Sequence, residues 1–306
     1  MTIDINMRKN SPKAWWLAAR PKTLSGAAVP VMIGCAYAFF LGGMDVFTQG
    51  GWLPALLCML FAFIMQIDAN FINDYYDCAK GRDNEERLGP LRACQQGWVS
   101  MKAMRKAIGL TSLLACIVGL PLIYYGGWGM MAVGALCVAF CFLYTICLAQ
   151  IGMGDLLVLV FFGIVPTVFT TYVVVPENLQ QLSMMPWNLG IATGLVTDCL
   201  LLVNNYRDID NDRKVGKKTL VVLIGKKNTE YLYMMLVPVA LIMVLVEFGF
   251  SNVNIILCFA VYFLHIGTWN KLKRIGEGRA LNGVLGETAR NIFIYGLLIS
   301  LLVILV

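Results

Sequence analysis

Long apolar segments recur along almost the whole of this 306-residue chain and restrict what it can fold into. Each is about 20 residues long, the length that an α-helix needs to cross the hydrocarbon core of a bilayer. They lie at residues 23–42, 51–72, 104–125, 128–149, 155–175, 187–206, 231–249, 251–269 and 289–306. Only 14% of the residues are charged, against about 25% in soluble domains. The sequence therefore predicts an all-α integral membrane protein, a bundle of nine transmembrane helices.

The distribution of basic residues predicts the orientation of this bundle. All 24 lysines and arginines lie in the segments 8–22, 80–106, 207–227 and 271–290. The loops around 43–50, 126–127 and 176–186 contain none. With nine spans the four basic segments fall on one side, which the positive-inside rule identifies as cytoplasmic. We expect a multi-pass protein of the inner (cytoplasmic) membrane with its N-terminal residues 1–22 in the cytoplasm.

The remaining composition narrows the class of protein further. Residues 1–22 lack the apolar core of a signal peptide, so none is expected. No linker or low-complexity stretch interrupts the helices, which favours a single membrane domain over residues 1–306. The net charge of +6 reflects the basic loops and gives no support to nucleic-acid binding. His265 is the only histidine, which excludes a histidine-based metal site.

A first cluster of acidic and amide residues stands at the end of the second apolar segment, within a region that continues as a loop to residue 102. It contains Asn70, Asn73, Asp74, Asp77 and, beyond Gly81, Asp83. If the helix continues through the cluster, then Asn70, Asp74 and Asp77 share one of its faces. Carboxylates next to hydrocarbon are costly unless a cationic group holds them. The cluster is therefore a candidate cation site.

A second cluster follows the sixth apolar segment, at the start of the region 204–227. Asn204, Asp208 and Asp212 recur at intervals of four residues and share a helix face, whereas Asp210 points elsewhere. We expect both clusters to line a central cavity that opens to the cytoplasmic face. Oxygen-only ligands suit Mg²⁺. The predicted metal ligands are Asp74, Asp77, Asp83, Asp208 and Asp212. The alternative is that both clusters are polar helix ends paired with neighbouring lysines and arginines.

Basic residues follow each cluster and favour a diphosphate as the ligand of the cation. The predicted diphosphate-binding residues are Lys80, Arg82, Arg92, Arg213, Lys214 and Lys218, with Arg87 and Lys217 nearby. Arginine makes bidentate contacts to phosphate and lysine provides a point charge. We favour Arg92, which follows the Leu88-Gly89-Pro90 turn, and Lys218. For each residue, a loop charge that only sets the topology is the alternative.

The two motifs together resemble a known family. NDYYDCAKGRD at 73–83 and RDIDNDRKVGKKTL at 207–220 are similar to the paired aspartate-rich motifs of the UbiA superfamily of intramembrane prenyltransferases. RPKTL at 20–24, GRDNEERLGPLRA at 81–93 and NNYRDIDNDRKVGKKTLVVLIG at 204–225 resemble the 1,4-dihydroxy-2-naphthoate polyprenyltransferase branch, which makes demethylmenaquinone. Gly81 stands where the general first motif has its last aspartate and Asp83 follows, a shift that this branch shares.

The resemblance implies Mg²⁺ as cofactor, with an isoprenyl diphosphate and an aromatic acid as substrates. The aromatic ring would be prenylated at its carboxyl-bearing carbon, with loss of CO₂ and pyrophosphate. The catalytic residues would then be Asp74, Asp77, Asp208 and Asp212. Asp198 is a further catalytic candidate because it is ionisable and lies inside an apolar segment, and the alternative is a hydrogen-bonded polar residue near the cavity. Substrate binding would involve Asn70, Asn73, Asn204, Tyr144, Arg20, Lys22 and Asp155, the last in a Gly-x-Gly-Asp sequence where family members have Gly-x-Gly-Glu.

Two other functions stay open at the level of the sequence. The first is a related prenyltransferase with another acceptor, such as 4-hydroxybenzoate, homogentisate or a chlorophyll precursor. The second is a cation-coupled transporter, although transporters place their carboxylates near the bilayer midplane. Here the carboxylates stand at helix ends beside basic loops, which favours phosphate capture. Neither the prenyl chain length nor the oligomeric state follows from the residues.

Overall fold

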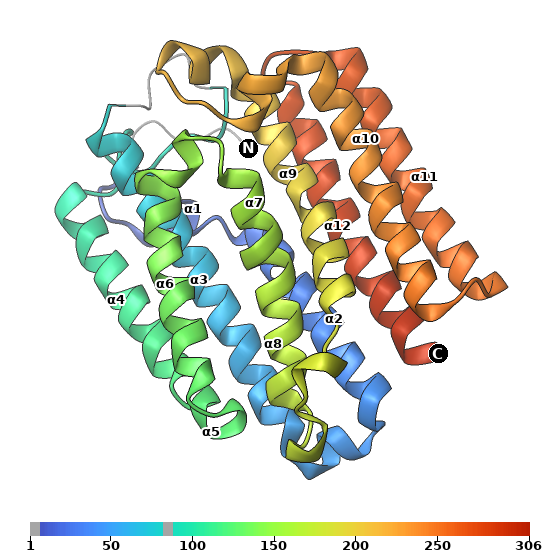
Figure 1. Cartoon of the computed structure of the whole chain (residues 1–306). Coiled ribbons are helices and arrows are strands. Elements are labelled where there is room, and N and C mark those ends of the chain that lie inside the picture. Colours follow the sequence, from blue (N-terminus) through green and yellow to red (C-terminus); the bar gives the residue numbers. More distant parts are fainter. Residues whose placement is uncertain (1–6, 82–87) are drawn as a thin grey trace.

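The computed structural model describes residues 7–81 and 88–306, and these stretches form helices without any strand. Figure 1 shows a single bundle whose long helices run roughly alongside one another. The helices are α1 (Pro12–Ala19), α2 (Leu24–Gly42), α3 (Trp52–Ala79), α4 (Met101–Gly119), α5 (Leu122–Gly126), α6 (Gly129–Ile146), α7 (Gly154–Leu159), α8 (Val165–Val174), α9 (Trp187–Lys214), α10 (Leu220–Phe248), α11 (Asn252–Ile275) and α12 (Leu281–Leu305). The expectation of an all-α membrane bundle is confirmed.

Within the described ranges, eight helical segments are long and apolar enough to cross a membrane by length and composition. One of them is formed by α7, a π-helical turn at Val160–Ile164 and α8. Each of the eight overlaps one of the expected apolar segments. The remaining expected segment, 104–125, corresponds to α4 and α5, and the first turns of α4 carry Lys102, Arg105 and Lys106. The count of nine spans thus stays a prediction.

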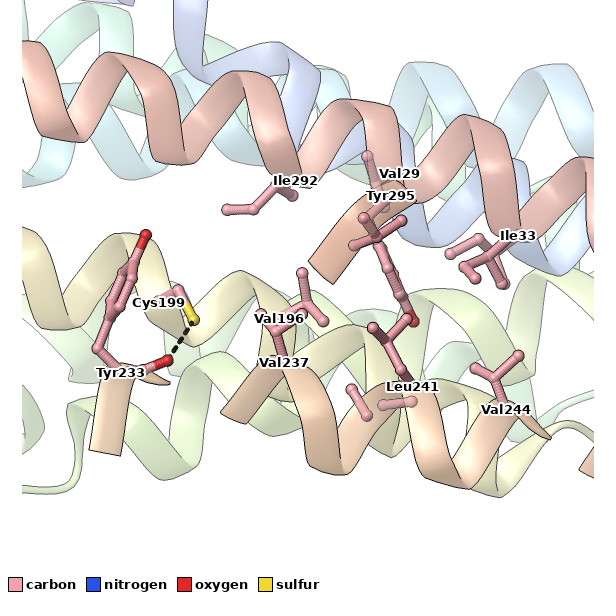
Figure 2. Packing of buried hydrophobic residues seen from close by; sticks show 14 of the residues in the cluster. Val29, Ile33, Val196, Cys199, Tyr233, Val237, Leu241, Val244, Ile292 and Tyr295 are labelled. Atoms are coloured by element: carbon pink, nitrogen blue, oxygen red, sulfur yellow. Dashed lines mark hydrogen bonds between the residues drawn. The ribbon is translucent and has the colours of Figure 1, made fainter. Parts of the chain in front are cut away.

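The largest hydrophobic core lies where α9 to α12 pack together and against α2. Val29 and Ile33 of α2, Val196 of α9, Val237 of α10 and Ile292 of α12 are among its buried members, as Figure 2 shows. Two smaller clusters lie beside it. One includes side chains of α2, α3 and α8, and the other joins α1, α3 and α4 to residues 93–99. The cores thereby hold α3 and α9, which carry the two acidic motifs, in fixed positions within one bundle.

Glycines bring the π-helical turn between α7 and α8 into backbone contact with α9. A β-carbon on Gly163 would lie 2.4 Å from the Cα of Gly194 and 2.5 Å from the carbonyl oxygen of Gly190. Helices in membranes associate closely at such small residues, because no side chain separates their backbones. The contact places α7, which begins at Gly154, beside the middle of α9.

Both acidic motifs lie inside helices, because α3 and α9 extend well beyond their apolar segments. Helix α3 ends at Ala79 instead of near residue 72, and α9 ends at Lys214 instead of near 206. Gly81 and Gly216 follow with φ of 62° and 72°, the left-handed conformation that commonly terminates a helix. The expected helical continuation through both motifs is confirmed. Figure 1 shows the two motif-bearing helix ends at the same end of the bundle.

Candidate functional site

Acidic side chains from three parts of the fold surround Tyr144 near the end of α6. The carboxylates of Asp77, Asp155, Asp198 and Asp212 all lie close enough to interact electrostatically with its phenol group. Asp212 also interacts electrostatically with Asp208 and Asp77. The aspartates of the first motif, on α3, therefore meet those of the second motif, on α9.

A small cavity lies beside Tyr144 and Asp155. It contains about 200 Å³ of space between atoms, including space that is open to solvent. Its lining residues come from α6, α7, α9 and the segments that follow α6 and α9: Tyr144, Ala149, Gly154, Asp155, Leu201, Asn205, Lys217 and Thr219. The wall thus combines an acid, a base and a phenol within a largely apolar bundle.

Asp77 forms a buried ion pair with Arg92. Nη2 of Arg92 donates a 2.7 Å hydrogen bond to Oδ2 of Asp77, and both side chains are mostly shielded from solvent. One residue was predicted to bind the metal and the other the diphosphate. The structure brings these two predicted residues into direct contact.

Asp74 takes a different position from its neighbour. Its two carboxylate oxygens accept 2.9 Å hydrogen bonds from the backbone N–H groups of Ala93 and Cys94, and the residue is 1% exposed. Burial, together with the nearby Asp74 carboxylate, raises the pKa of the Cys94 thiol, so the thiol stays protonated at neutral pH. Asp74 thereby fixes the loop after the first motif. Its role as a metal ligand stays a prediction.

The predicted polar residues on either side of Asp77 join α3 to its neighbours. Asn70 donates to the carbonyl oxygen of Ala19 at 2.9 Å and to Oγ1 of Thr23 at 3.0 Å. Asn73 accepts a 2.8 Å hydrogen bond from Thr145 through Oδ1. Lys80 donates to the carbonyl oxygen of Ile146 at 2.9 Å. These contacts connect the first motif to the RPKTL segment and to the end of α6.

Arg207 organises the second motif, and sequence reasoning missed it. Its Nε and Nη2 atoms donate to the two oxygens of Asp208 at 2.9 and 2.6 Å. Nη2 also donates to Asn204 at 2.8 Å, and Nη1 donates to Asn282 of α12 at 2.9 Å. The Arg207 side chain is 1% exposed. The sequence did contain a signal for this role. Arg207 directly precedes Asp208 within the predicted helix, so it is not one of the loop residues that only set the topology.

The ion pair of Asp212 is longer than that of Asp208. Nζ of Lys217 lies 3.5 Å from both carboxylate oxygens of Asp212, and the lysine side chain is 27% exposed and lines the cavity. The side chain of Asp210, 73% exposed, lies 3.7 Å from Arg213, as expected for a residue that points elsewhere.

Two further predicted diphosphate ligands lie near the end of α9. Lys214 is its last residue and is exposed, and Lys218 is exposed in the segment that follows, where its backbone N–H bonds to Gln150. Lys217, which sequence reasoning did not favour, is thus the lysine of this group that lines the cavity.

Asp155 and Asp198 form an acidic pair beside Tyr144. The two carboxylates interact electrostatically, and one oxygen of each is buried without a hydrogen-bond partner. Asp68, another buried aspartate, differs because Thr111 and Ser112 satisfy both of its oxygens at 2.5 and 2.7 Å. The unsatisfied oxygens distinguish Asp155 and Asp198 as groups that can accept a hydrogen bond from a ligand.

The other predicted residues lie between α1 and α2 or outside the described ranges. Arg20 joins α1 to the short helix at Pro21–Thr23 with a left-handed φ of 51°, and Lys22 is exposed. Arg82 and Asp83, together with Arg87, lie outside the described residues.

The donor set fits Mg²⁺ bound together with a phosphate ligand. Among the described residues, no three acidic, histidine or cysteine side chains are grouped so that they hold a metal ion by themselves. Asp77, Asp208 and Asp212 each face a basic side chain instead. Proteins usually bind Mg²⁺ through one or two carboxylates plus substrate phosphates and not in a complete protein cage. Carboxylates that each stand beside a basic group, without a complete cage of their own, match that mode.

This arrangement of two acidic helix ends beside basic side chains in an apolar bundle is typical of a membrane-embedded enzyme that acts on a phosphorylated substrate. The UbiA prenyltransferase family matches residues 27–281. The chain belongs to this family.

Its relatives span several groups of organisms. It is 36% identical over 227 residues to the 1,4-dihydroxy-2-naphthoate octaprenyltransferase of Escherichia coli, covering 71% of this chain and 70% of that protein. It is 34% identical over 243 residues to the Haemophilus influenzae protein of the same name, with 74% of each covered. The UbiA prenyltransferase domain-containing protein 1 of Danio rerio is 30% identical over 250 residues, with coverage of 77% and 68%.

Solved structures share the fold at low sequence identity. The apo structure of a UbiA homolog from Aeropyrum pernix matches with a TM-score of 0.66 at 15% identity, covering 90% of this chain and 97% of that one. A UbiA homolog from Archaeoglobus fulgidus bound to DMAPP and Mg²⁺ matches with a TM-score of 0.60 at 14% identity, covering 94% and 98%. The bundle is therefore the fold of this family.

Proposed function

We propose that this protein transfers a polyprenyl group from an isoprenyl diphosphate to 1,4-dihydroxy-2-naphthoate, with loss of CO₂ and pyrophosphate, in the synthesis of demethylmenaquinone. The observation that carries the proposal is the electrostatic interaction of Asp212 with both Asp77 and Asp208, next to Lys217, which lines the cavity beside Tyr144. The choice of acceptor is supported by bacterial relatives named for 1,4-dihydroxy-2-naphthoate. DMAPP and Mg²⁺ in a homologous structure support the donor and the cofactor.

Asp77, Asp208 and Asp212 would hold magnesium in this proposal, and Asp74 and Asp83 stay predicted ligands. When bound, the metal supplies Lewis-acid stabilisation of the negative charge on the leaving diphosphate. Arg92 and Lys217 stand next to these carboxylates and would bind phosphate oxygens. Lys217 suits capture of the diphosphate, because its contact with Asp212 is long and its side chain is partly exposed. Lys80, Arg213, Lys214 and Lys218 stay predicted diphosphate ligands.

The acceptor side of the site would lie against Tyr144, Asp155 and Asp198. The ring carbon that carries the carboxylate forms a bond to the allylic carbon, while the allylic C–O electron pair leaves with pyrophosphate. Loss of CO₂ then returns an electron pair to the ring and yields the prenylated quinol. The unsatisfied oxygens of Asp155 and Asp198 would orient a ring hydroxyl, and Arg20 and Lys22 are candidates to pair with the carboxylate.

The surrounding bundle would shield the reaction from water, which otherwise captures an allylic cation. We propose one membrane domain over residues 1–306 with nine spans, α4 and α5 together forming the ninth. The four basic segments support a site at the cytoplasmic side of the inner membrane. The isoprenoid tail would extend into the lipid bilayer, and no nucleic-acid partner is proposed.

Product analysis tests this function directly. Purified protein is incubated with Mg²⁺, 1,4-dihydroxy-2-naphthoate and prenyl diphosphates of several lengths, and the products are identified by mass spectrometry. We expect a prenylated, decarboxylated naphthoquinol that requires Mg²⁺ and is absent after chelation with EDTA. A product from 4-hydroxybenzoate or homogentisate, with none from 1,4-dihydroxy-2-naphthoate, would contradict the assignment of the acceptor.

A further inference from the structure

Arg207 and Asn282 connect the two diphosphate motifs through a segment that neither motif contains. The Asn282 side chain accepts a hydrogen bond from Nη1 of Arg207 and donates one to the carbonyl oxygen of Leu88, both 2.9 Å long. Leu88 begins the described part of the loop that carries Arg92, the partner of Asp77. A chain of direct contacts therefore runs from Asp208 through Arg207 and Asn282 to the loop of the first motif.

The packing of this connection leaves little freedom. A β-carbon on Gly89 would lie 2.6 Å from Nη2 of Arg207, so the loop backbone rests directly on the guanidinium group. Only a side chain with both an acceptor and a donor satisfies Arg207 and Leu88 together, which an asparagine amide does. The same loop is held to α3 by Asp74 through the N–H groups of Ala93 and Cys94.

We propose that Arg207 and Asn282 are positioning residues that set the separation of the two motifs, and thereby the affinity for the Mg²⁺–diphosphate pair. This inference rests on the proposed function. A carboxylate has about four lone-pair sites, so Asp208 can keep both hydrogen bonds from Arg207 and still coordinate a cation. Hydrogen bonds behind a ligating carboxylate orient it, and their loss commonly weakens metal binding 10- to 100-fold.

Two substitutions of Asn282 test its hydrogen bonds to Arg207 and to Leu88. Asn282→Asp keeps an oxygen for Arg207 but loses the donor to Leu88, and Asn282→Ala loses both. Asn291→Ala is the matched control on the same helix, because Asn291 also bridges two groups, the Leu264 carbonyl oxygen at 3.1 Å and Thr268 at 2.8 Å. These contacts join α12 to α11 and touch neither acidic motif.

The measurement is equilibrium binding of geranyl diphosphate as a function of Mg²⁺ concentration, with thermal unfolding in detergent recorded in parallel. We expect both Asn282 variants to need about tenfold more Mg²⁺ for half-saturation. In turnover assays the KM for the prenyl diphosphate should rise, while the KM for the aromatic acceptor stays within about twofold. Asn291→Ala should lower the unfolding temperature without changing the Mg²⁺ requirement.

Wild-type Mg²⁺ dependence in the Asn282 variants, or an equal weakening in Asn291→Ala, would overturn the proposal. If the Asn282 variants do not fold, Gly89→Ala tests the same junction from the loop, where the added methyl group must displace Arg207, and unaltered binding in that variant also overturns it. The binding assay contains no acceptor, so a wrong acceptor assignment leaves its result unchanged.

Discussion

At the residue scale, the partners of each aspartate decide its role, and sequence spacing does not reveal them. Asp74 and Asp77 lie one turn apart on α3, yet one accepts two backbone N–H groups and the other pairs with Arg92. Asp208 and Asp210 differ in the same way, because one is held by Arg207 and the other is mostly exposed. Aspartates with similar spacing are therefore expected to have very different effects when substituted.

The pair Asp208 and Asp210 offers a test with a built-in control. Asp208→Asn removes a charge that we place on the metal, so turnover should fall about 100-fold or more. Asp210→Asn removes an equal charge two residues away, and turnover should stay within about twofold because that carboxylate faces solvent. Initial rates of pyrophosphate release at saturating Mg²⁺ give both values. Equal losses in the two variants would refute a specific role for Asp208.

At the element scale, hydrophobicity located the helices but underestimated their lengths. Helices α3, α9 and α11 extend beyond the ends of their apolar segments, because polar residues continue each helix until Gly81, Gly216 or Gly276 follows with a positive φ. Gly225 interrupts α10 with a φ of 79°, so the first turns after Thr219 form a separate short piece. The contact of Gly163 with α9 was not expected, because a glycine in the sequence does not indicate which segment its backbone will contact.

This glycine contact predicts a difference between two alanine substitutions. Gly163→Ala forces a methyl group against the backbone of Gly194 and Gly190, and overpacking of this kind costs about 1–3 kcal/mol. Gly134→Ala in α6 meets no atom within 4 Å and removes a flexible residue from a helix, so stability should be equal or up to about 1 kcal/mol higher. Thermal unfolding in detergent compares them. Similar unfolding temperatures for both variants would contradict the close approach.

At the scale of the whole molecule, the segregation of charge predicts the orientation of the bundle in the membrane. Basic residues gather on the segments that connect helices at the end where the motifs meet, while the loops around 43–50, 126–127 and 176–186 have none. Figure 1 shows residues 43–50 and 176–186 at the opposite end of the bundle from the motifs. The cytoplasmic location of the site follows if the positive-inside rule holds for this chain.

Accessibility of single cysteines checks this orientation. Arg279→Cys and Ser183→Cys each place an exposed thiol, one in the basic segment before α12 and the other in the loop before α9. The exposed Cys116 and Cys147 are first replaced by serine to remove background. A membrane-impermeant maleimide should label position 183 in intact cells depleted of outer membrane, and position 279 only after lysis. The reverse pattern would place the site on the outer side.

The sequence by itself determined the helical class, the places of the apolar segments and the two acidic clusters. The length of an apolar segment and the charge of a loop are properties of contiguous residues. They can therefore be recognised without knowing which segments contact one another in the fold. Most candidate site residues followed from the motifs in the same way, including Asp77, Arg92 and Asp208.

Only the tertiary structure decided which of these residues contact one another. It placed Lys217 on the cavity wall, turned Asp74 towards the loop at 93–94 and joined Arg207 to Asn282. The physical reason is that a hydrogen bond depends on atoms a few ångströms apart, and here its partners lie up to 194 residues apart in the chain. A local sequence pattern cannot predict which distant residues will be this close, because the packing of the helices determines it.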